Sequence, residues 1–145
     1  MSKLEKYICK DVLAPAEKVK DMAEYLTTPA LELNSTKGFG NQNLKFTWTP
    51  VRKAFIMEKE PHKHDNDQFL IFVGSNPNNL LDLGGEVELT LSEDGKNFET
   101  FVFTNATFVS VPRGLYHCPL NFKKINDPMK PIMFHDFYLG EYRRV

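Results

Sequence analysis

The sequence predicts an all-β domain, a barrel or a sandwich of two sheets, with a short helix before it. From residue 44 onward, short segments rich in Val, Ile, Thr and Phe alternate with turns that contain Gly or Pro. Twelve phenylalanines among 145 residues favour strands around an aromatic interior, where Trp48 is also expected. A chain of this length forms one ordinary core and no linker divides it, so we expect a single domain over residues 1–145.

Charge and hydropathy argue against two classes of partner. The formal net charge is −1 and no basic stripe is visible, so we do not expect nucleic-acid binding. No run of eighteen apolar residues is present, which excludes a helix that spans a membrane. The first residues lack the long apolar region of a secretory signal, and the two cysteines, Cys9 and Cys118, lie far apart. These features favour the reducing environment of the cytoplasm.

The first 43 residues are expected to form a helix followed by a loop. Val19, Met22, Ala23 and Leu26 recur at helical spacing within residues 15–26, and Pro15 suits the first turn of a helix. Residues 31–43 are rich in Asn, Gly, Ser and Thr, which is typical of a loop. The barrel core is expected over residues 44–139, with extended segments at 44–49, 51–58, 68–73, 86–91, 98–104, 107–111 and 132–139.

Two of these segments are expected to form a hairpin. The pair Asp94-Gly95 lies between them, and both residue types tolerate a positive φ in a tight turn. Before the turn, Val87, Leu89 and Leu91 share one face of the extended chain, while the residues between them are polar. This alternation indicates an antiparallel strand with one buried face.

Three of the four histidines suggest a metal site. His62 and His64 are two residues apart in an extended segment, so their imidazoles point to the same side and can chelate one divalent ion. Gln68 follows four residues later and offers an amide oxygen as a further ligand. His117 comes after the turn residues Pro112 and Gly114 and supplies a third imidazole. The alternative is that these are ordinary polar strand residues.

The order of these parts resembles the cupin superfamily. The first cupin motif is matched by His62, His64 and Gln68 and, in shape, by Gly74. The second is matched in the stretch PRGLYHCPLN, by Pro112, Gly114, His117 and Asn121. The resemblance covers roughly residues 44 to 139. It implies a jelly-roll β-barrel that encloses one divalent metal ion, Fe, Mn, Zn or Ni, held by His62, His64, Gln68 and His117.

The sequence departs from the cupin pattern in three places. Ile56 stands where the first motif usually begins with Gly, and residues 75–83 form an insertion after the strand that follows the histidines. Gln68 replaces the usual glutamate, so the ligands are all neutral and the metal keeps its full 2+ charge, which favours anionic chelating ligands. Two alternatives stay open: Gln68 does not bind the metal, or Asp65 or Asp67 replaces it.

Three further residues lie near the predicted metal ligands in the sequence pattern or in the expected barrel interior. His135 lies on a face with Met133, Phe137 and Leu139, which should line the barrel interior, so His135 is a candidate general acid or base. A hydrogen-bonded core histidine is the other interpretation. Arg113 is a candidate for binding a substrate carboxylate, unless it is simply solvated. Cys118 has the opposite parity to His117 and is not expected to be a ligand.

Two functions are compatible with these residues. The first is an enzyme that acts on a small anionic oxygenated metabolite by Lewis-acid or oxygenase chemistry, as an isomerase, lyase, decarboxylase or dioxygenase. The second is a cupin without catalytic activity that binds or senses a small molecule. The resemblance also implies a homodimer that forms through barrel edges. Residues 3–28 are expected to cover an edge or a partner subunit. The insertion at residues 75–83 is expected to pack on the barrel or a partner, or to act as a lid over the metal.

Overall fold

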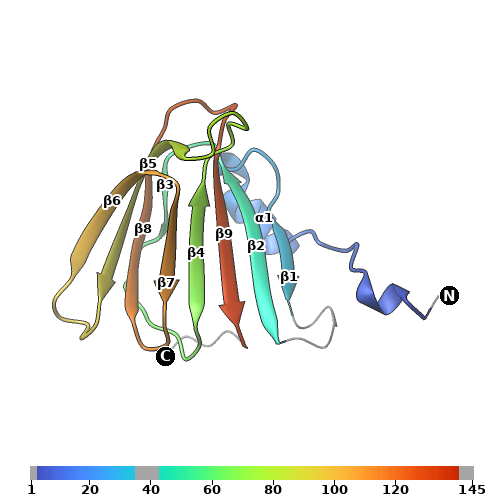
Figure 1. Ribbon diagram of the computed structural model, residues 1–145, viewed down its shortest axis with the longest axis horizontal. Coiled ribbons are helices and arrows are strands. Elements are labelled where there is room, and N and C mark those ends of the chain that lie inside the picture. The colour runs from blue at the N-terminus through green and yellow to red at the C-terminus, as the bar shows by residue number, and fades with distance from the viewer. Residues whose placement is uncertain (1–2, 35–42, 141–145) are drawn as a thin grey trace.

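Two antiparallel sheets face each other and enclose the core (Figure 1). The structure is a computed structural model that describes residues 3–34 and 43–140. The five-stranded sheet has the order β1 (Leu31–Asn34), β2 (Leu44–Val51), β9 (Ile132–Leu139), β4 (Gln68–Val73) and β7 (Thr107–Val111). The four-stranded sheet has the order β3 (Phe55–Glu58), β8 (Tyr116–Ile125), β5 (Asp82–Ser92) and β6 (Glu99–Asn105). The predicted all-β architecture is therefore confirmed.

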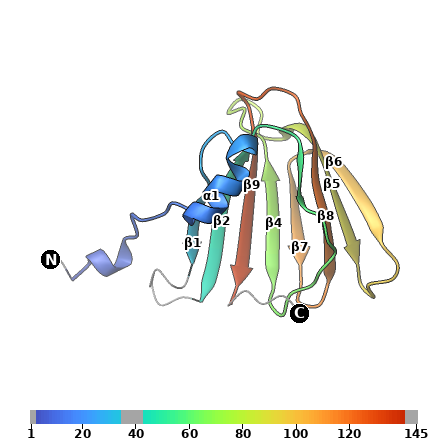
Figure 2. The ribbon, with the colours of Figure 1, turned by 180° about the vertical axis from the view of Figure 1, so that it is seen from behind.

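The expected N-terminal helix is present and slightly shorter than expected. It consists of α1 (Ala16–Met22) continued by the 3-10 turn η2 (Ala23–Tyr25), and a second 3-10 turn, η1 (Glu5–Tyr7), precedes it. Val19 and Met22, from the predicted apolar stripe, pack against the core. Figure 2 shows α1 beside β1 and β2, with the chain before it extending away from the barrel. None of the described helices is long and apolar enough to cross a membrane.

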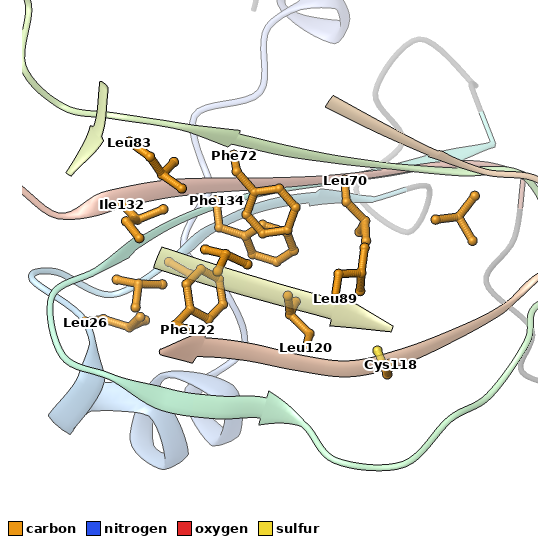
Figure 3. Packing of buried hydrophobic residues seen from close by; sticks show 14 of the residues in the cluster. Leu26, Leu70, Phe72, Leu83, Leu89, Cys118, Leu120, Phe122, Ile132 and Phe134 are labelled. Carbon is orange, nitrogen blue, oxygen red and sulfur yellow. The ribbon is translucent and has the colours of Figure 1, made fainter. Parts of the chain in front are cut away.

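The core is aromatic, as the composition predicts. Phe72, Phe122 and Phe134 form its centre, with ring centroids 5.0 to 6.0 Å apart (Figure 3). Phe72 comes from the larger sheet and Phe122 from the smaller, so their contact joins the two sheets. Trp48, expected in this core, is instead 40% exposed and lies on the outer face of the larger sheet.

Two strands were not predicted. β1 lies within residues 31–43, which were expected to be a loop, and pairs with β2. β8 is the central partner of both β3 and β5, but Pro119 and the preceding Pro-Gly turn hide its extended character in the sequence. The expected 86–91 strand is longer than predicted, and its buried Val87 and Leu89 confirm the alternation.

The predicted turn at Asp94-Gly95 connects β5 and β6. Gly95 has φ +73°, and Asp94 Oδ1 accepts hydrogen bonds from the backbone N–H groups of Lys96 and Asn97, both at 2.8 Å. These hydrogen bonds hold the pKa of the Asp94 carboxyl well below its usual range.

The insertion follows the end of β4 that is distant from the motif residue Gln68. Gln68 begins β4, whereas residues 75–81 follow its end, so the two are at opposite ends of the barrel (Figure 1). Leu83 folds back fully into the core, as expected, while Leu80 and Leu81 are 62% and 61% exposed. None of the residues 75–83 lines the cavity that contains the histidines, and the lid hypothesis is therefore not supported.

Candidate metal centre

Backbone hydrogen bonds hold the two histidine segments side by side. His62 and His64 lie in the connection between β3 and β4, and His117 lies on β8. The His62 N–H donates to the His117 carbonyl at 3.1 Å, and the His117 N–H donates to the His62 carbonyl at 2.9 Å. The Gly114 N–H donates to the His64 carbonyl at 2.9 Å. The turn before β8 thus fixes the backbone of both motifs.

The three imidazoles converge. Their ring centroids are separated by 4.8 Å for His62 and His64, 4.3 Å for His62 and His117, and 4.7 Å for His64 and His117. The Nε2 atoms of His64 and His117 are 3.0 Å apart. Two nitrogen ligands about 2.1 Å from one ion lie roughly 3.0–3.4 Å from each other in octahedral or tetrahedral geometry. The pair is therefore spaced as two ligands of one ion would be.

Hydrogen bonds set the tautomers of two of these rings. His62 Nδ1 is 2.9 Å from the Glu60 carbonyl, and His117 Nδ1 is 3.2 Å from the Leu115 carbonyl. Because a carbonyl oxygen only accepts, each Nδ1 carries the proton. A proton at Nδ1 makes Nε2 the nitrogen through which a neutral ring would bind a cation, as in metal sites where a second partner orients the histidine.

Gln68 presents an unsatisfied acceptor beside the histidines. Its side chain is 3% exposed, and Nε2 donates to Asp136 Oδ1 at 2.6 Å. This donation fixes the orientation of the amide, and Oε1 is buried with no hydrogen-bond partner among the described residues. A buried acceptor without a donor costs roughly 1–3 kcal/mol. A cation at this oxygen would remove that cost.

The hydrogen-bonded partner of Gln68 is a buried acid that the sequence did not single out. Burial raises the pKa of Asp136, while hydrogen bonds from Gln68 and Tyr138 and the charge of Lys45 oppose the rise. Asp136 lies on the inner face of β9 with Phe134 and Tyr138, next to β4.

Cys118 also reaches the site, although its parity in the sequence argued against it. Leu89 pairs with Leu120, and Leu91 pairs with His117. Between these two pairs β8 therefore contains one residue more than β5, which is a β-bulge. This bulge, where Cys118 has φ +86°, turns both His117 and Cys118 inward. The ligand atoms of His62, His117 and Cys118 all lie within 4.8 Å of one another. The signal in the sequence was Pro119, since proline inside a strand indicates a bulge.

These groups open into a cavity of about 290 Å³ between the sheets. Leu70, Leu120 and Phe134 make its apolar wall. The polar and charged wall residues come from β2, β3, β4, β8, β9 and the adjoining segments: Lys18, Lys45, Thr47, Thr49, Glu58, His62, Gln68, His117 and Asp136. A small metabolite fits this volume, which is near the lower end for ligand pockets.

Two lysines on the cavity wall share one buried carboxylate. Glu32 Oε1 is 3.1 Å from Lys18 Nζ and 3.4 Å from Lys45 Nζ. Burial alone would raise the pKa of Glu32, but the two ammonium groups outweigh it and lower the pKa. Burial lowers the pKa of Lys45, and the nearby charge of Lys18 adds to this effect. The two lysines and Glu32 together leave one unit of positive charge at this wall, while the carboxyl groups of Glu58 and Asp136 line the same cavity.

Two predicted site residues lie elsewhere. His135 was expected on the inner face of β9, but the inner face consists of Ile132, Phe134, Asp136 and Tyr138. His135 faces outward, and its ring lies edge-on to that of Trp48 with the ring centroids 5.4 Å apart. Arg113 is 70% exposed, pairs with Asp67 at 4.0 Å and does not line the cavity. Neither placement supports the role expected from the sequence.

Comparison with known proteins identifies the fold. No protein-family model and no curated protein matches the sequence. A point variant of Bacillus subtilis oxalate decarboxylase matches the structure with a TM-score of 0.54 at 12% identity, over 80% of this chain and 28% of that chain. A Bacillus subtilis oxalate decarboxylase described for its Mn(II) centres matches with a TM-score of 0.53 at 14% identity, over 79% and 26%. The chain has the cupin fold.

The cupin jelly roll predicted from the two motifs is thus confirmed. A third variant of the same enzyme gives a TM-score of 0.54 at 16% identity, over 81% of this chain and 27% of that chain. The chain therefore spans about a quarter of the length of the solved chains it matches. At these identities the likeness concerns the fold alone, and ligands and activity depend on the residues of the site.

Proposed function

We propose that this protein is a metal-binding cupin that holds one divalent ion with His62, His64, His117 and the amide oxygen of Gln68, and acts on a small anionic oxygenated metabolite. The observation that carries the proposal is the convergence of three imidazoles beside a buried amide oxygen with no hydrogen-bond partner among the described residues. Cys118, within 4.8 Å of two of these histidines, is the candidate replacement if one ligand is displaced.

The charge of the site favours an anionic ligand. Three imidazoles and an amide are neutral donors, so the ion would keep its 2+ charge and supply Lewis-acid or oxygenase chemistry to a chelating oxyanion. Lys45 lines the same cavity and adds positive charge to its wall. Lys45 thus replaces Arg113 as the candidate that attracts a substrate carboxylate.

The other residues of the cavity orient the ligands and exclude water. Asp136 accepts from Gln68 Nε2 and thereby directs Gln68 Oε1 away from itself. The carbonyls of Glu60 and Leu115 orient the rings of His62 and His117. Leu70 and the other apolar wall residues reduce the local dielectric, which strengthens every charge interaction within the cavity.

Metal titration of the purified protein tests the ligand set. Isothermal titration calorimetry with Mn(II), Fe(II), Zn(II) and Ni(II) should show one site per chain. The Fe(II) titration is carried out without oxygen. His64→Ala and His117→Ala should weaken binding at least about tenfold, the lower end of the range for disrupted metal sites. His135→Ala is the matched control, because His135 lies on the outer face of β9 and should leave binding unchanged. Equal affinity in all four proteins would refute the proposed site.

Turnover of small acids by the metal-loaded protein tests the activity. Oxalate is the first acid to assay, because the structurally similar chains are oxalate decarboxylases. Other chelating hydroxy and keto acids follow, with product analysis in the presence and absence of oxygen to separate the two chemistries. Binding that perturbs the Mn(II) spectrum without turnover of any acid would favour the sensing role over an enzyme. Lys45→Met should weaken acid binding while the metal stays bound.

A further inference from the structure

The thiol of Cys118 lies inside the cavity that contains the histidines. Cys118 is 3% exposed and lines this cavity together with His62 and His117. Figure 3 shows its sulfur directed from β8 into the space between the sheets. Neighbouring residues of a regular strand point to opposite sides, so His117 and Cys118 reach the same cavity because of the bulge in β8. This strand therefore supplies two donors of different chemistry, an imidazole and a thiol.

The thiol is close enough to the histidines to share an ion with them. The ligand atoms of His62, His117 and Cys118 lie within 4.8 Å of one another. His64 joins the same group, because its Nε2 is 3.0 Å from His117 Nε2. A sulfur and a nitrogen bound to one tetrahedral Zn(II) ion are about 3.6 Å apart. The sulfur therefore has to move by about 1 Å at most, which is within the range of a rotation about the Cα–Cβ bond of Cys118.

A second observation, independent of the cysteine, supports an ion at this place. Gln68 is 3% exposed and lines the same cavity, and its Oε1 is buried with no hydrogen-bond partner among the described residues. Gln68 lies on β4 of the larger sheet, whereas Cys118 lies on β8 of the smaller sheet. The two sheets thus offer different additional donors to the same three histidines.

The two additional donors differ in the ions that they prefer and in their charge. A carbonyl oxygen such as that of the Gln68 amide suits Mn(II), whereas a thiolate is a soft ligand that suits Zn(II) and Cu(I). With three imidazoles, the neutral amide leaves the full 2+ charge on the ion, and a thiolate reduces it to 1+. Three imidazoles and one thiolate also complete the four-coordinate shell of a structural zinc site, in which no position is open.

We propose that the identity of the ion selects the fourth ligand: Cys118 takes the place of Gln68 when the three histidines bind Zn(II), and leaves that place to Gln68 when they bind Mn(II). The inference rests on the proposed function, because the histidines are common to both ligand sets. In the Zn(II) form, Cys118 occupies the position that a chelating acid would need. The ion thereby decides whether the cavity is open or closed to anionic ligands.

The alternative role of Cys118 is packing. Cys118 belongs to the hydrophobic core cluster, near Leu120 of the same strand (Figure 3). A buried cysteine often acts as a small apolar side chain. Under that alternative, replacing the thiol changes the stability of the chain and has no effect on which ions it binds. The two roles are therefore separated by ion binding rather than by stability.

Absorption spectroscopy of the full chain with Cd(II), a soft analogue of Zn(II), tests the proposal. A thiolate bound to Cd(II) gives a charge-transfer band in the ultraviolet, which imidazole and amide ligands do not. The band should saturate at one Cd(II) per chain, and Zn(II) should remove it by competition. The sequence contains two cysteines, so Cys118→Ser should abolish the band. Cys9→Ser is the matched control and should retain it, because Cys9 does not line the cavity.

Calorimetry of the same variants measures the selectivity between ions. Cys118→Ser should weaken Zn(II) binding at least about tenfold, as expected for a disrupted metal site, and should change Mn(II) affinity less than about twofold. Circular dichroism establishes that each variant is folded, and Cys118→Ala replaces Cys118→Ser if the serine variant is not. If neither folds, the wild-type band and its retention in Cys9→Ser decide the outcome.

The possible failures of the two proposals are distinguishable. A wild type that binds Mn(II) but gives no thiolate band with Cd(II) would overturn this inference and leave the proposed function intact. A wild type that binds neither ion would overturn both. A band that persists in Cys118→Ser, or an equal loss of Zn(II) and Mn(II) affinity in that variant, would also overturn the role of the thiol as a ligand selected by the ion.

Discussion

Gln68→Glu should place a second carboxyl group beside that of Asp136, so that the two share one proton. Metal binding should then release that proton. Gln68 Nε2 lies 2.6 Å from Asp136 Oδ1, so the new carboxylate would face a second one at about that distance. Two unit charges at 2.6 Å repel by about 6 kcal/mol at an effective dielectric constant of 20. One of the two carboxyls therefore keeps its proton near neutral pH, and the pair titrates as a unit.

Proton release during metal titration measures this coupling. Gln68→Glu should bind the metal more tightly than the wild type, because a carboxylate cancels one unit of its charge. Its affinity should rise about tenfold per pH unit, since one proton leaves per ion bound. Calorimetry in two buffers of different ionisation enthalpy counts that proton.

The double variant Gln68→Glu with Asp136→Asn is the matched control, because it has the same ligand charge and no second acid. It should release about one proton fewer. Equal proton release in the two variants would refute the contact between residues 68 and 136. A metal affinity equal to that of the wild type in Gln68→Glu would show that Gln68 is not a ligand.

Three further predictions concern stability. Glu32→Gln removes the buried anion between two lysines and should lower the free energy of unfolding by roughly 1–3 kcal/mol in urea titrations, whereas Glu24→Gln, in an exposed pair, should change it little. Burial lowers the pKa of His135, so the folded chain binds this proton less tightly and stability should fall as the pH drops below about 6.5; His135→Gln should reduce that slope. Gly95→Ala should lower the melting temperature more than Gly114→Ala, because both have positive φ but only at Gly95 would the new methyl group lie 2.8 Å from a tyrosine ring; equal shifts would contradict this reasoning.

Much of the site could be predicted because it depends on local spacing. His62 and His64 share a side through strand geometry alone, and the Pro-Gly turn before His117 signals where the chain returns to them. The buried Val87 and Leu89 follow from alternation in the same way. These features need only the period of an extended chain and the conformational preferences of Pro and Gly, both of which are properties of the sequence.

The tertiary structure decided which face of each strand points inward. Alternation places Met133, His135 and Phe137 together, but it does not say whether that set faces the cavity or the outside. The strand registers place Asp136 on the inner face, where its carboxylate accepts a hydrogen bond from Gln68. They place the apolar set on the outer face. Likewise, the bulge in β8 brought Cys118 to the histidines, and pairing of β1 with β2 put Lys45 on the cavity wall beside Glu32. Each depends on pairing between distant segments, which local spacing does not encode.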